Sequence, residues 1–100
     1  TYEILACSAV LRDLKRLDEA LREEIRRKHF PAIKNAPYQA RPLTGPFRGL
    51  FSYHFSYRGT PYRIVYEVVE EEKVVLVLMI GKREGFYRAL REDSGNDEER

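Results

Sequence analysis

The chain has 100 residues, of which 43% are hydrophobic and 34% charged, which predicts one soluble globular domain. No apolar run approaches the roughly 18 residues of a membrane span, and a single cysteine excludes an internal disulfide. The formal net charge of +2 is uneven, because residues 92–100 carry five acids and one base while the other 91 residues carry a net charge of +6. A basic body suits a polyanion or an acidic partner, although surface charge kept for solubility explains it equally well.

The same features predict the cellular location of the chain and the end of its domain. With one cysteine and no charged-then-apolar leader at its start, the chain is expected to be cytoplasmic. Cys7 ends an apolar stretch and is expected to be a buried structural thiol rather than a nucleophile. We expect residues 1–91 to form one domain, followed by a disordered acidic tail at 92–100 that has no apolar residue.

Residues 2–35 predict a strand followed by two antiparallel helices. The run from Tyr2 to Cys7 is rich in strand formers. Ser8 and Asp18 are candidate N-caps, because each side chain can accept a hydrogen bond from a free backbone N–H of the next helical turn. Apolar residues at helical spacing predict two facing stripes: Val10, Leu11, Leu14 and Leu17 in the first helix, and Leu21, Ile25, His29 and Ile33 in the second.

A proline interrupts the second of these helices. Pro31 has no backbone N–H, so we expect a bend near Phe30, with helix resuming to about Asn35. His29 lies on the apolar stripe, and no cluster of cysteines or carboxylates completes a metal site around it, so a packed structural role is expected. Acid-first pairs four residues apart are expected on the solvent side of this helix: Asp18–Arg22, Glu23–Arg27 and Glu24–Lys28.

The second half of the chain predicts three strands. After a proline-rich connector at 36–46, which Leu43 is expected to attach to the core, residues 47–57 alternate between apolar and polar side chains. Residues 61–69 alternate as well, and residues 74–80 are apolar on both parities, as expected of a central strand. The predicted fold is α+β in the order β-α-α-β-β-β. A largely antiparallel sheet is packed on one face by a helical hairpin, and a short C-terminal helix follows Gly85.

Cationic and phenolic side chains are expected to gather at one end of this sheet. In a hairpin of strands 61–69 and 74–80, the start of the first strand lies beside the end of the second. Arg63 is therefore expected to meet Lys82 and Arg83, with Tyr87 just beyond. The uncovered sheet face and its edge add three further candidates, which are His54, Arg48 and Arg58.

These residue types suit chemistry on a phosphate. Guanidinium groups match phosphate oxygens and stabilise charge as it develops, while a histidine or tyrosine beside them moves a proton or stacks on a base. Together they suit metal-free RNA cleavage, in which the 2′-hydroxyl attacks its own phosphate. The alternative is structural: strand-end arginines that only contact water, Tyr87 as a packing residue, and His54 as an exposed residue of a sheet face.

Several stretches resemble the RelE/ParE superfamily of bacterial and archaeal toxins, and most closely its RelE branch. They are Leu14-Lys-Arg-Leu17, Leu43-Thr-Gly45, Tyr62-Arg-Ile-Val-Tyr66, and Ile80-Gly-Lys-Arg83 followed by Tyr87. The likeness covers about residues 2–90, and the last two stretches are the specific ones. The resemblance implies the toxin of a type II toxin–antitoxin system, a ribosome-dependent mRNA endonuclease that cuts codons in the A site. It implies no cofactor and a cognate antitoxin that holds the toxin inactive.

The resemblance also implies roles for individual residues. Arg63 would contact phosphate, Arg83 would stabilise the transition state, and Tyr87 would stack on or orient the substrate base, although its spacing from Arg83 is shorter than in the family. Lys82, Arg48 and Arg58 would bind substrate. Where the best-known branch has alternating lysines, this chain has Ser52, His54 and Ser56, so either His54 replaces them as the base or the site is weaker or differently selective.

Two other functions fit the same resemblance. ParE-like relatives share the fold and an antitoxin partner but inhibit DNA gyrase by binding, without cutting RNA. A catalytically silent relative would bind only its antitoxin. In each case we expect the antitoxin to lay an amphipathic helix beside the hairpin or the sheet edge and to bring acidic side chains near Arg63 and Arg83 or displace segment 85–91.

Overall fold

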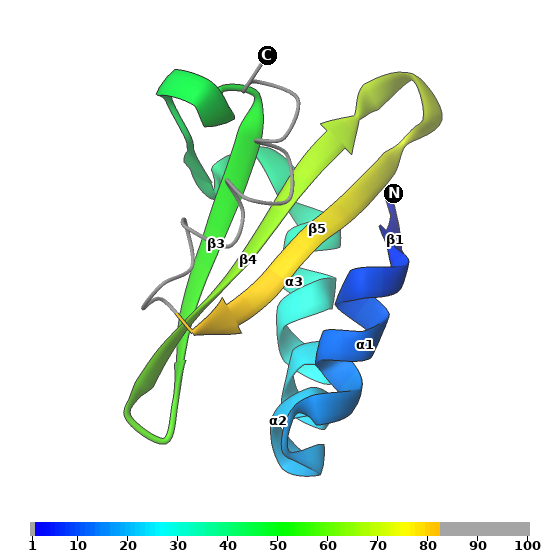
Figure 1. Cartoon of the computed structure of the whole chain (residues 1–100). Coiled ribbons are helices and arrows are strands. Elements are labelled where there is room, and N and C mark those ends of the chain that lie inside the picture. The colour runs from blue at the N-terminus through cyan, green and yellow to red at the C-terminus, as the bar shows by residue number, and fades with distance from the viewer. Residues whose placement is uncertain (1, 83–100) are drawn as a thin grey trace.

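The computed structural model describes residues 2–82, and a five-stranded sheet is the frame of that part of the chain (Figure 1). The strand order is β1-β5-β4-β3-β2. β1 pairs parallel with β5 and the other neighbours pair antiparallel, so the sheet is largely antiparallel, as predicted. The predicted helix after Gly85 and the predicted tail at 92–100 lie outside the described residues. The strands are β1 Glu3–Ala6, β2 Arg41–Pro42, β3 Leu50–Tyr57, β4 Thr60–Val69 and β5 Val74–Lys82.

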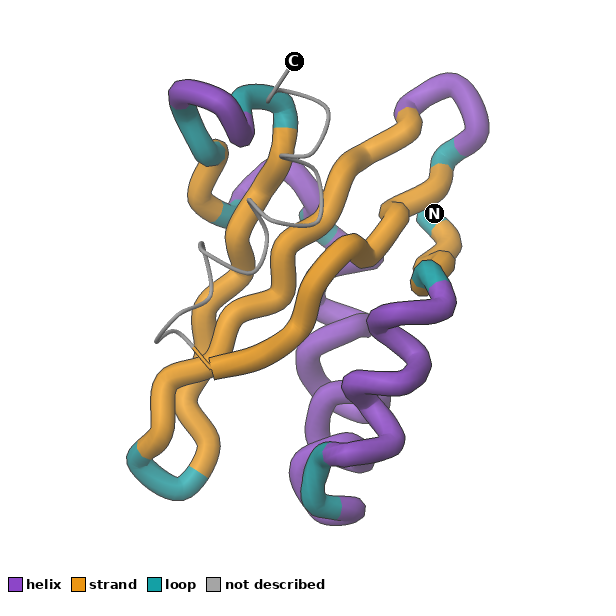
Figure 2. The backbone as a smooth tube through the Cα atoms, viewed as in Figure 1, coloured by secondary structure: helices purple, strands orange, loops and turns teal. Residues whose placement is uncertain are grey.

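A helical hairpin covers one face of this sheet (Figure 2). Its elements are α1 Ser8–Arg16, α2 Glu19–Glu24, a π-helical turn η1 at Ile25–His29, and α3 Phe30–Asn35. No helix within residues 2–82 is long and apolar enough to cross a membrane. Short 3₁₀ turns complete the described part: η2 Pro37–Gln39, η3 Gly45–Phe47 and η4 Glu70–Glu72. The α+β class and the helical hairpin are therefore confirmed.

The connector before β3 is more structured than predicted. The strand expected from residue 47 begins only at Leu50, because Phe47 ends a 3₁₀ turn and Gly49 has a φ of 100°, which an extended strand does not allow. The short strand β2 was not predicted. It pairs with Ser52 and Phe51 of β3, and Leu43, as expected, is packed, here against Val65.

The two predicted helix caps differ in outcome. The Ser8 prediction is wrong, because Ser8 is the first residue of α1 and Cys7 occupies the N-cap position without a side-chain hydrogen bond. The Asp18 prediction is confirmed, since its carboxylate accepts a hydrogen bond from the Leu21 N–H at 3.4 Å. Arg22 Nη1 donates to the Leu14 carbonyl at 3.0 Å and so satisfies a C-terminal carbonyl of α1 instead of the predicted pair with Asp18.

A π-helical turn stands where the sequence predicted a bend. Phe30 N–H donates to the Ile25 carbonyl five residues back, directly before Pro31, which has no N–H to donate. The wider turn also brings residues five apart into contact, so that His29 Nε2 lies 2.9 Å from Glu24 Oε2. The predicted i,i+4 pairs are therefore wrong: Glu24 contacts His29 rather than Lys28, and Glu23 pairs with Arg26 rather than with the residue after it.

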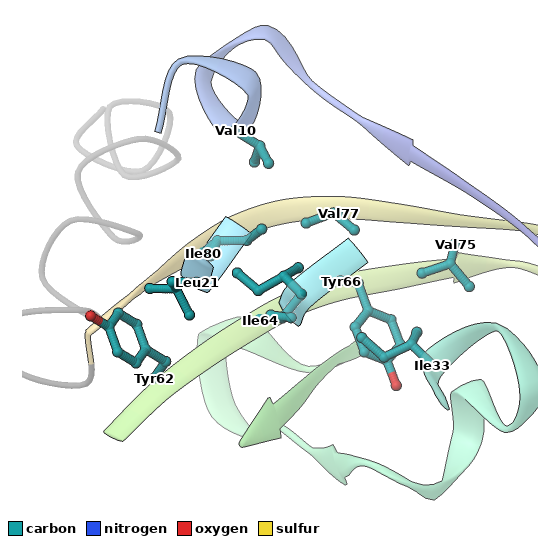
Figure 3. Packing of buried hydrophobic residues seen from close by; sticks show 10 residues of the cluster. Val10, Leu21, Ile33, Tyr62, Ile64, Tyr66, Val75, Val77 and Ile80 are labelled. Carbon is teal, nitrogen blue, oxygen red and sulfur yellow. The ribbon is translucent and has the colours of Figure 1, made fainter. Parts of the chain in front are cut away.

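The core lies between the hairpin and the sheet (Figure 3). The stripe predicted for the second helix is buried throughout, whereas Leu11 of the first stripe is 51% exposed and Cys7 is half-buried against the core. Full burial of one large aliphatic side chain stabilises the fold by about 1.5–3 kcal/mol. The buried apolar residues of this core are Val10, Leu21, Ile25, Ile33, Tyr62, Ile64, Tyr66, Val75, Val77 and Ile80.

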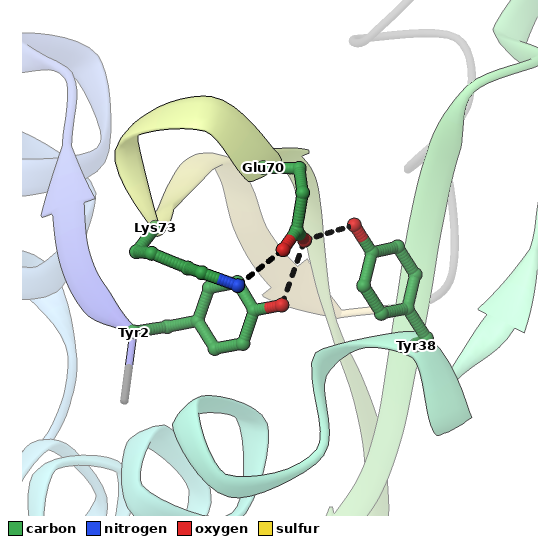
Figure 4. A network of polar contacts seen from close by, with 4 residues as sticks. All are labelled: Tyr2, Tyr38, Glu70 and Lys73. Carbon is green, nitrogen blue, oxygen red and sulfur yellow. Dashed lines mark hydrogen bonds and ion pairs between the residues drawn. The ribbon is translucent and has the colours of Figure 1, made fainter.

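The acidic turn between β4 and β5 joins three separate segments (Figure 4). Tyr2 and Tyr38 donate hydrogen bonds to Glu70 Oε1 at 2.7 and 2.6 Å, and Lys73 forms an ion pair with the same carboxylate. The hydrogen bonds from Lys73, Tyr38 and Tyr2 lower the pKa of Glu70 to about 2. The hydrogen bond to Glu70 is likewise the main reason that the pKa of Tyr38 rises to about 12.

Candidate nucleic-acid interface

The sheet face opposite the helices carries two of the predicted site residues, His54 and Arg63. On β3 and β4 the aromatic side chains of one parity turn toward the hairpin; Phe55 and Tyr62, for example, stack with ring centroids 5.6 Å apart. Because side chains alternate along a strand, His54 and Arg63 point to the other face. The alternation predicted for residues 61–69 is thus present in the structure.

Strand register places these two residues side by side. His54 of β3 lies opposite Arg63 of β4, and Arg63 lies opposite Gly81 of β5. Side chains at directly opposite positions have Cβ atoms about 4.5–5.5 Å apart, so His54 and Arg63 are immediate neighbours. Lys82 follows Gly81 and pairs with Tyr62, so it lies at the same end of the sheet as Arg63 but on the face that Tyr62 turns toward the hairpin. The hairpin therefore brings Arg63, Lys82 and His54 to one end of the sheet, whereas Arg83 and Tyr87 lie outside the described residues.

The two neighbours differ in their exposure to water. Arg63 is only 7% exposed, so its guanidinium places a permanent positive charge within the sheet face. His54 is exposed, and its Nε2 lies 2.9 Å from the Oγ of Ser52, two residues back on the same face of β3. A fixed cation next to a proton-accepting group can hold a phosphate and move a proton beside it.

Arg48 and Arg58 lie at opposite ends of β3. Arg58 occupies the β3–β4 turn at a φ of 51°, with its guanidinium carbon 5.2 Å from the centroid of the Tyr57 ring. Arg48 follows the turn η3. At about 3.3 Å per strand residue, Arg58 lies roughly 13 Å and Arg48 roughly 20 Å from His54 along the chain. The structure therefore does not bring either arginine to the His54–Arg63 pair. Only a ligand that extends along the strand would reach all of them.

An apolar cluster adjoins the His54–Arg63 pair on the same face. Val65, which is fully buried, lies opposite Ser52 on one side and Met79 on the other. Leu43, Phe47 and Leu50 pack against it. The site thus combines the Arg63 guanidinium and the His54 imidazole with an apolar surface next to them, a combination suited to nucleotides, which present both phosphates and flat bases.

The remaining histidine is structural, as predicted. His29 is 4% exposed, its Nδ1 lies 2.9 Å from the Tyr53 hydroxyl, and its ring stacks on Phe55 at 4.0 Å. Burial, and then the charge of Glu24, raise the pKa of Tyr53. Within residues 2–82, no three histidine, cysteine or acidic side chains lie close enough together to hold a metal ion.

Sequence reasoning missed Ser52. The alternation of β3 predicts it only as one of three polar residues on a strand face, yet it is 1% exposed and contacts His54. The i,i+2 spacing of a hydroxyl and an imidazole on one strand face was the available signal. The burial of Ser52 could not be predicted from this spacing, because it depends on the strands at either side of β3.

Residues 4–91 match the family model described as the ParE-like toxin of type II bacterial toxin–antitoxin systems. The chain belongs to this toxin family. The resemblance to the RelE/ParE superfamily is thereby confirmed.

Individual relatives of this toxin are found among both sequences and structures. The mRNA interferase toxin RelE of Escherichia coli strain K12 is 32% identical over 75 residues, which cover 74% of this toxin and 75% of that protein. A crystal structure of the intact E. coli RelBE toxin–antitoxin complex matches the fold with a TM-score of 0.69 at 24% identity, over 84% of this toxin and 99% of that chain. A RelBE toxin–antitoxin complex from Mycobacterium tuberculosis gives a TM-score of 0.69 at 26% identity, over 82% and 98% of the two chains.

Proposed function

We propose that this toxin is a RelE-like mRNA interferase, an endoribonuclease that cuts mRNA in the ribosomal A site. The observation that carries the proposal is the His54–Arg63 pair on the sheet face opposite the helical hairpin, with Lys82 at the end of the next strand. The 32% identity to the mRNA interferase toxin RelE supports the same activity.

In the proposed reaction the 2′-hydroxyl oxygen attacks the adjacent phosphorus and the bond from phosphorus to the 5′ oxygen breaks. The products are a 2′,3′-cyclic phosphate and a 5′-hydroxyl. His54 takes the proton of the 2′-hydroxyl, and the leaving 5′ oxygen takes a proton from water. Arg63 and Arg83 stabilise the extra negative charge on the phosphate oxygens, so the step as written needs no metal ion. Tyr87 stacks on the substrate base.

The remaining candidates extend the surface that holds the RNA. Lys82 adds a cation at the end of β5, and Arg48 and Arg58 contact phosphates farther along the strand. The ribosome presents the mRNA, and the toxin acts in the cytoplasm. We also propose that residues 1–91 form the toxin domain and that residues 92–100 form an acidic tail.

A cognate antitoxin is the second proposed partner. RelE is held in toxin–antitoxin complexes in the E. coli and M. tuberculosis structures. We expect the antitoxin of this toxin to bring acidic side chains near Arg63 and Arg83, or to displace segment 85–91. Charge reversal at both arginines should then weaken antitoxin binding, and equal affinity for the reversed and original toxins would refute the acidic contact.

The deciding experiment maps RNA 3′ ends after purified toxin is added to a cell-free translation reaction. Arg83→Ala and Arg63→Ala should each lower cleavage by about 10²–10³-fold, by analogy with the loss of one oxyanion-stabilising donor. His54→Ala should lower it by about 10²–10⁴-fold if His54 is the base. Arg12→Ala, an exposed arginine on α1, is the matched control and should cut normally. Cuts without ribosomes, or cuts unaffected by Arg83→Ala and Arg63→Ala, would contradict the proposal.

A gyrase-binding function is the alternative that a specific observation favours. The matching family model is ParE-like, and this chain has Ser52, His54 and Ser56 where the RelE branch is expected to have lysines. A toxin that blocks growth while mRNA stays intact should then inhibit gyrase in a supercoiling assay. Intact mRNA together with normal growth would instead indicate a silent relative that only binds its antitoxin.

A further inference from the structure

A buried hydroxyl contacts the proposed base. Ser52 is 1% exposed, and its Oγ lies 2.9 Å from Nε2 of the exposed His54. We propose that Ser52 is a positioning residue: its Oγ accepts a hydrogen bond from His54 Nε2–H, which makes Nδ1 the nitrogen that takes the substrate proton. This inference rests on the proposed function, in which His54 is the base.

The strand geometry holds the hydroxyl in place. Ser52 pairs with Arg41 of β2 on one side and with Val65 of β4 on the other, so its backbone lies within the sheet. His54 is two residues farther along β3 and therefore on the same face. A side chain fixed in this way restricts the rotamers of the exposed imidazole that it contacts.

The direction of the hydrogen bond follows from the proton transfer. Once His54 has taken a proton, both ring nitrogens are donors, and Ser52 Oγ must then be the acceptor. If Oγ already accepts from Nε2–H in the neutral state, the hydroxyl need not reorient when the proton arrives. Such preorganisation lowers the barrier to the step, and it also sets which tautomer is present before the reaction.

His29 is an internal contrast. Its two ring nitrogens contact Glu24 and Tyr53, its ring stacks on Phe55, and it is buried. The protein thus places one histidine in the core with contacts at both nitrogens and the other beside a serine on the site face. Because these are the only two histidines in the chain, their signals can be separated by a single His54→Ala variant.

The first test reads the tautomer directly, from the ring ¹⁵N chemical shifts of the histidines in the full chain. The measurement is made at a pH where His54 is neutral. Wild type and Ser52→Thr should show the Nε2–H form of His54, and Ser52→Ala should show a smaller fraction of that form, with the His29 signals unchanged. An Nδ1–H form in wild type, or the same His54 spectrum in wild type and Ser52→Ala, would overturn the proposal.

The second test uses cleavage and a double-mutant cycle. Ser52→Ala should reduce kcat by about tenfold with little change in KM, and Ser52→Thr should restore it. In the His54→Ala background Ser52→Ala should cost nothing further, because Ser52 acts through His54. An equal loss in both backgrounds would refute positioning. If wild type does not cut RNA, the proposed function fails, whereas the ring spectra still decide the Ser52–His54 contact.

Discussion

The hydroxyl of Tyr66 offers a sharp test of how the core is held together. Tyr66 is fully buried and donates a hydrogen bond to the Pro37 carbonyl oxygen at 2.5 Å, which joins β4 to the turn after α3. Burial raises the pKa of Tyr66 to about 12, so the hydroxyl is a neutral donor at pH 7. Tyr66→Phe keeps the ring but leaves the Pro37 carbonyl without this donor.

The expected loss follows from the burial of both groups. Leaving a buried acceptor without its partner costs about 1–3 kcal/mol. A loss of about 1.5 kcal/mol lowers the melting temperature of a domain of this size by roughly 6–12 °C. Thermal unfolding followed by circular dichroism at pH 7 measures the shift, and urea unfolding checks the free energy.

Tyr62→Phe is the matched control. Tyr62 is 9% exposed and stacks on Phe55, but its hydroxyl makes no hydrogen bond with any residue of 2–82. Removing that hydroxyl should change stability by less than about 0.5 kcal/mol. Equal melting temperatures for the Tyr66→Phe and Tyr62→Phe variants would show that the Pro37 hydrogen bond contributes nothing measurable.

Three further predictions concern other parts of the fold. Because the pKa of Glu70 is lowered to about 2 in the folded state, its contribution to stability is present above its ordinary pKa of 4.5 and is lost as the pH falls toward 2. Glu70→Gln should therefore flatten the decline of unfolding free energy over that range, and an unchanged acid titration would refute the contact. His29→Leu should cost about 2–3 kcal/mol in urea unfolding, because it leaves Glu24 and Tyr53 without their partner, whereas Lys28→Leu at an exposed position should cost little. Arg58→Asn should raise the unfolding free energy by about 0.5–1 kcal/mol, since asparagine tolerates the positive φ of this two-residue turn better than arginine, and a loss of stability would count against turn strain.

Local patterns predicted much of the frame that carries the site. The stripe of Leu21, Ile25 and Ile33 is buried as its spacing indicated, and the alternation along β4 separates Tyr66 from Arg63 as period-2 geometry requires. A hairpin connects neighbouring segments, so the position of Arg63 and Lys82 at the same end of the sheet follows from sequence order alone.

Other features depend on contacts that are remote in sequence. Nothing local indicates that Glu70 receives hydrogen bonds from Tyr2 and Tyr38, which lie 68 and 32 residues away. The π-helical turn is a related case: Pro31 signals an irregularity, but only the packing of His29 against Tyr53 and Phe55 shows which form it takes.

The sequence by itself determined the class of the fold, the helical hairpin, the strand faces and the toxin-like motifs, because each of these follows from spacing along one segment or between adjacent ones. Only the tertiary structure decided that β1 lies parallel beside β5, that Arg63 is almost buried, and that Ser52 is enclosed beside His54. Burial and strand neighbours arise where distant segments meet. A side chain's role at the site is therefore set by partners that its own stretch of sequence does not contain.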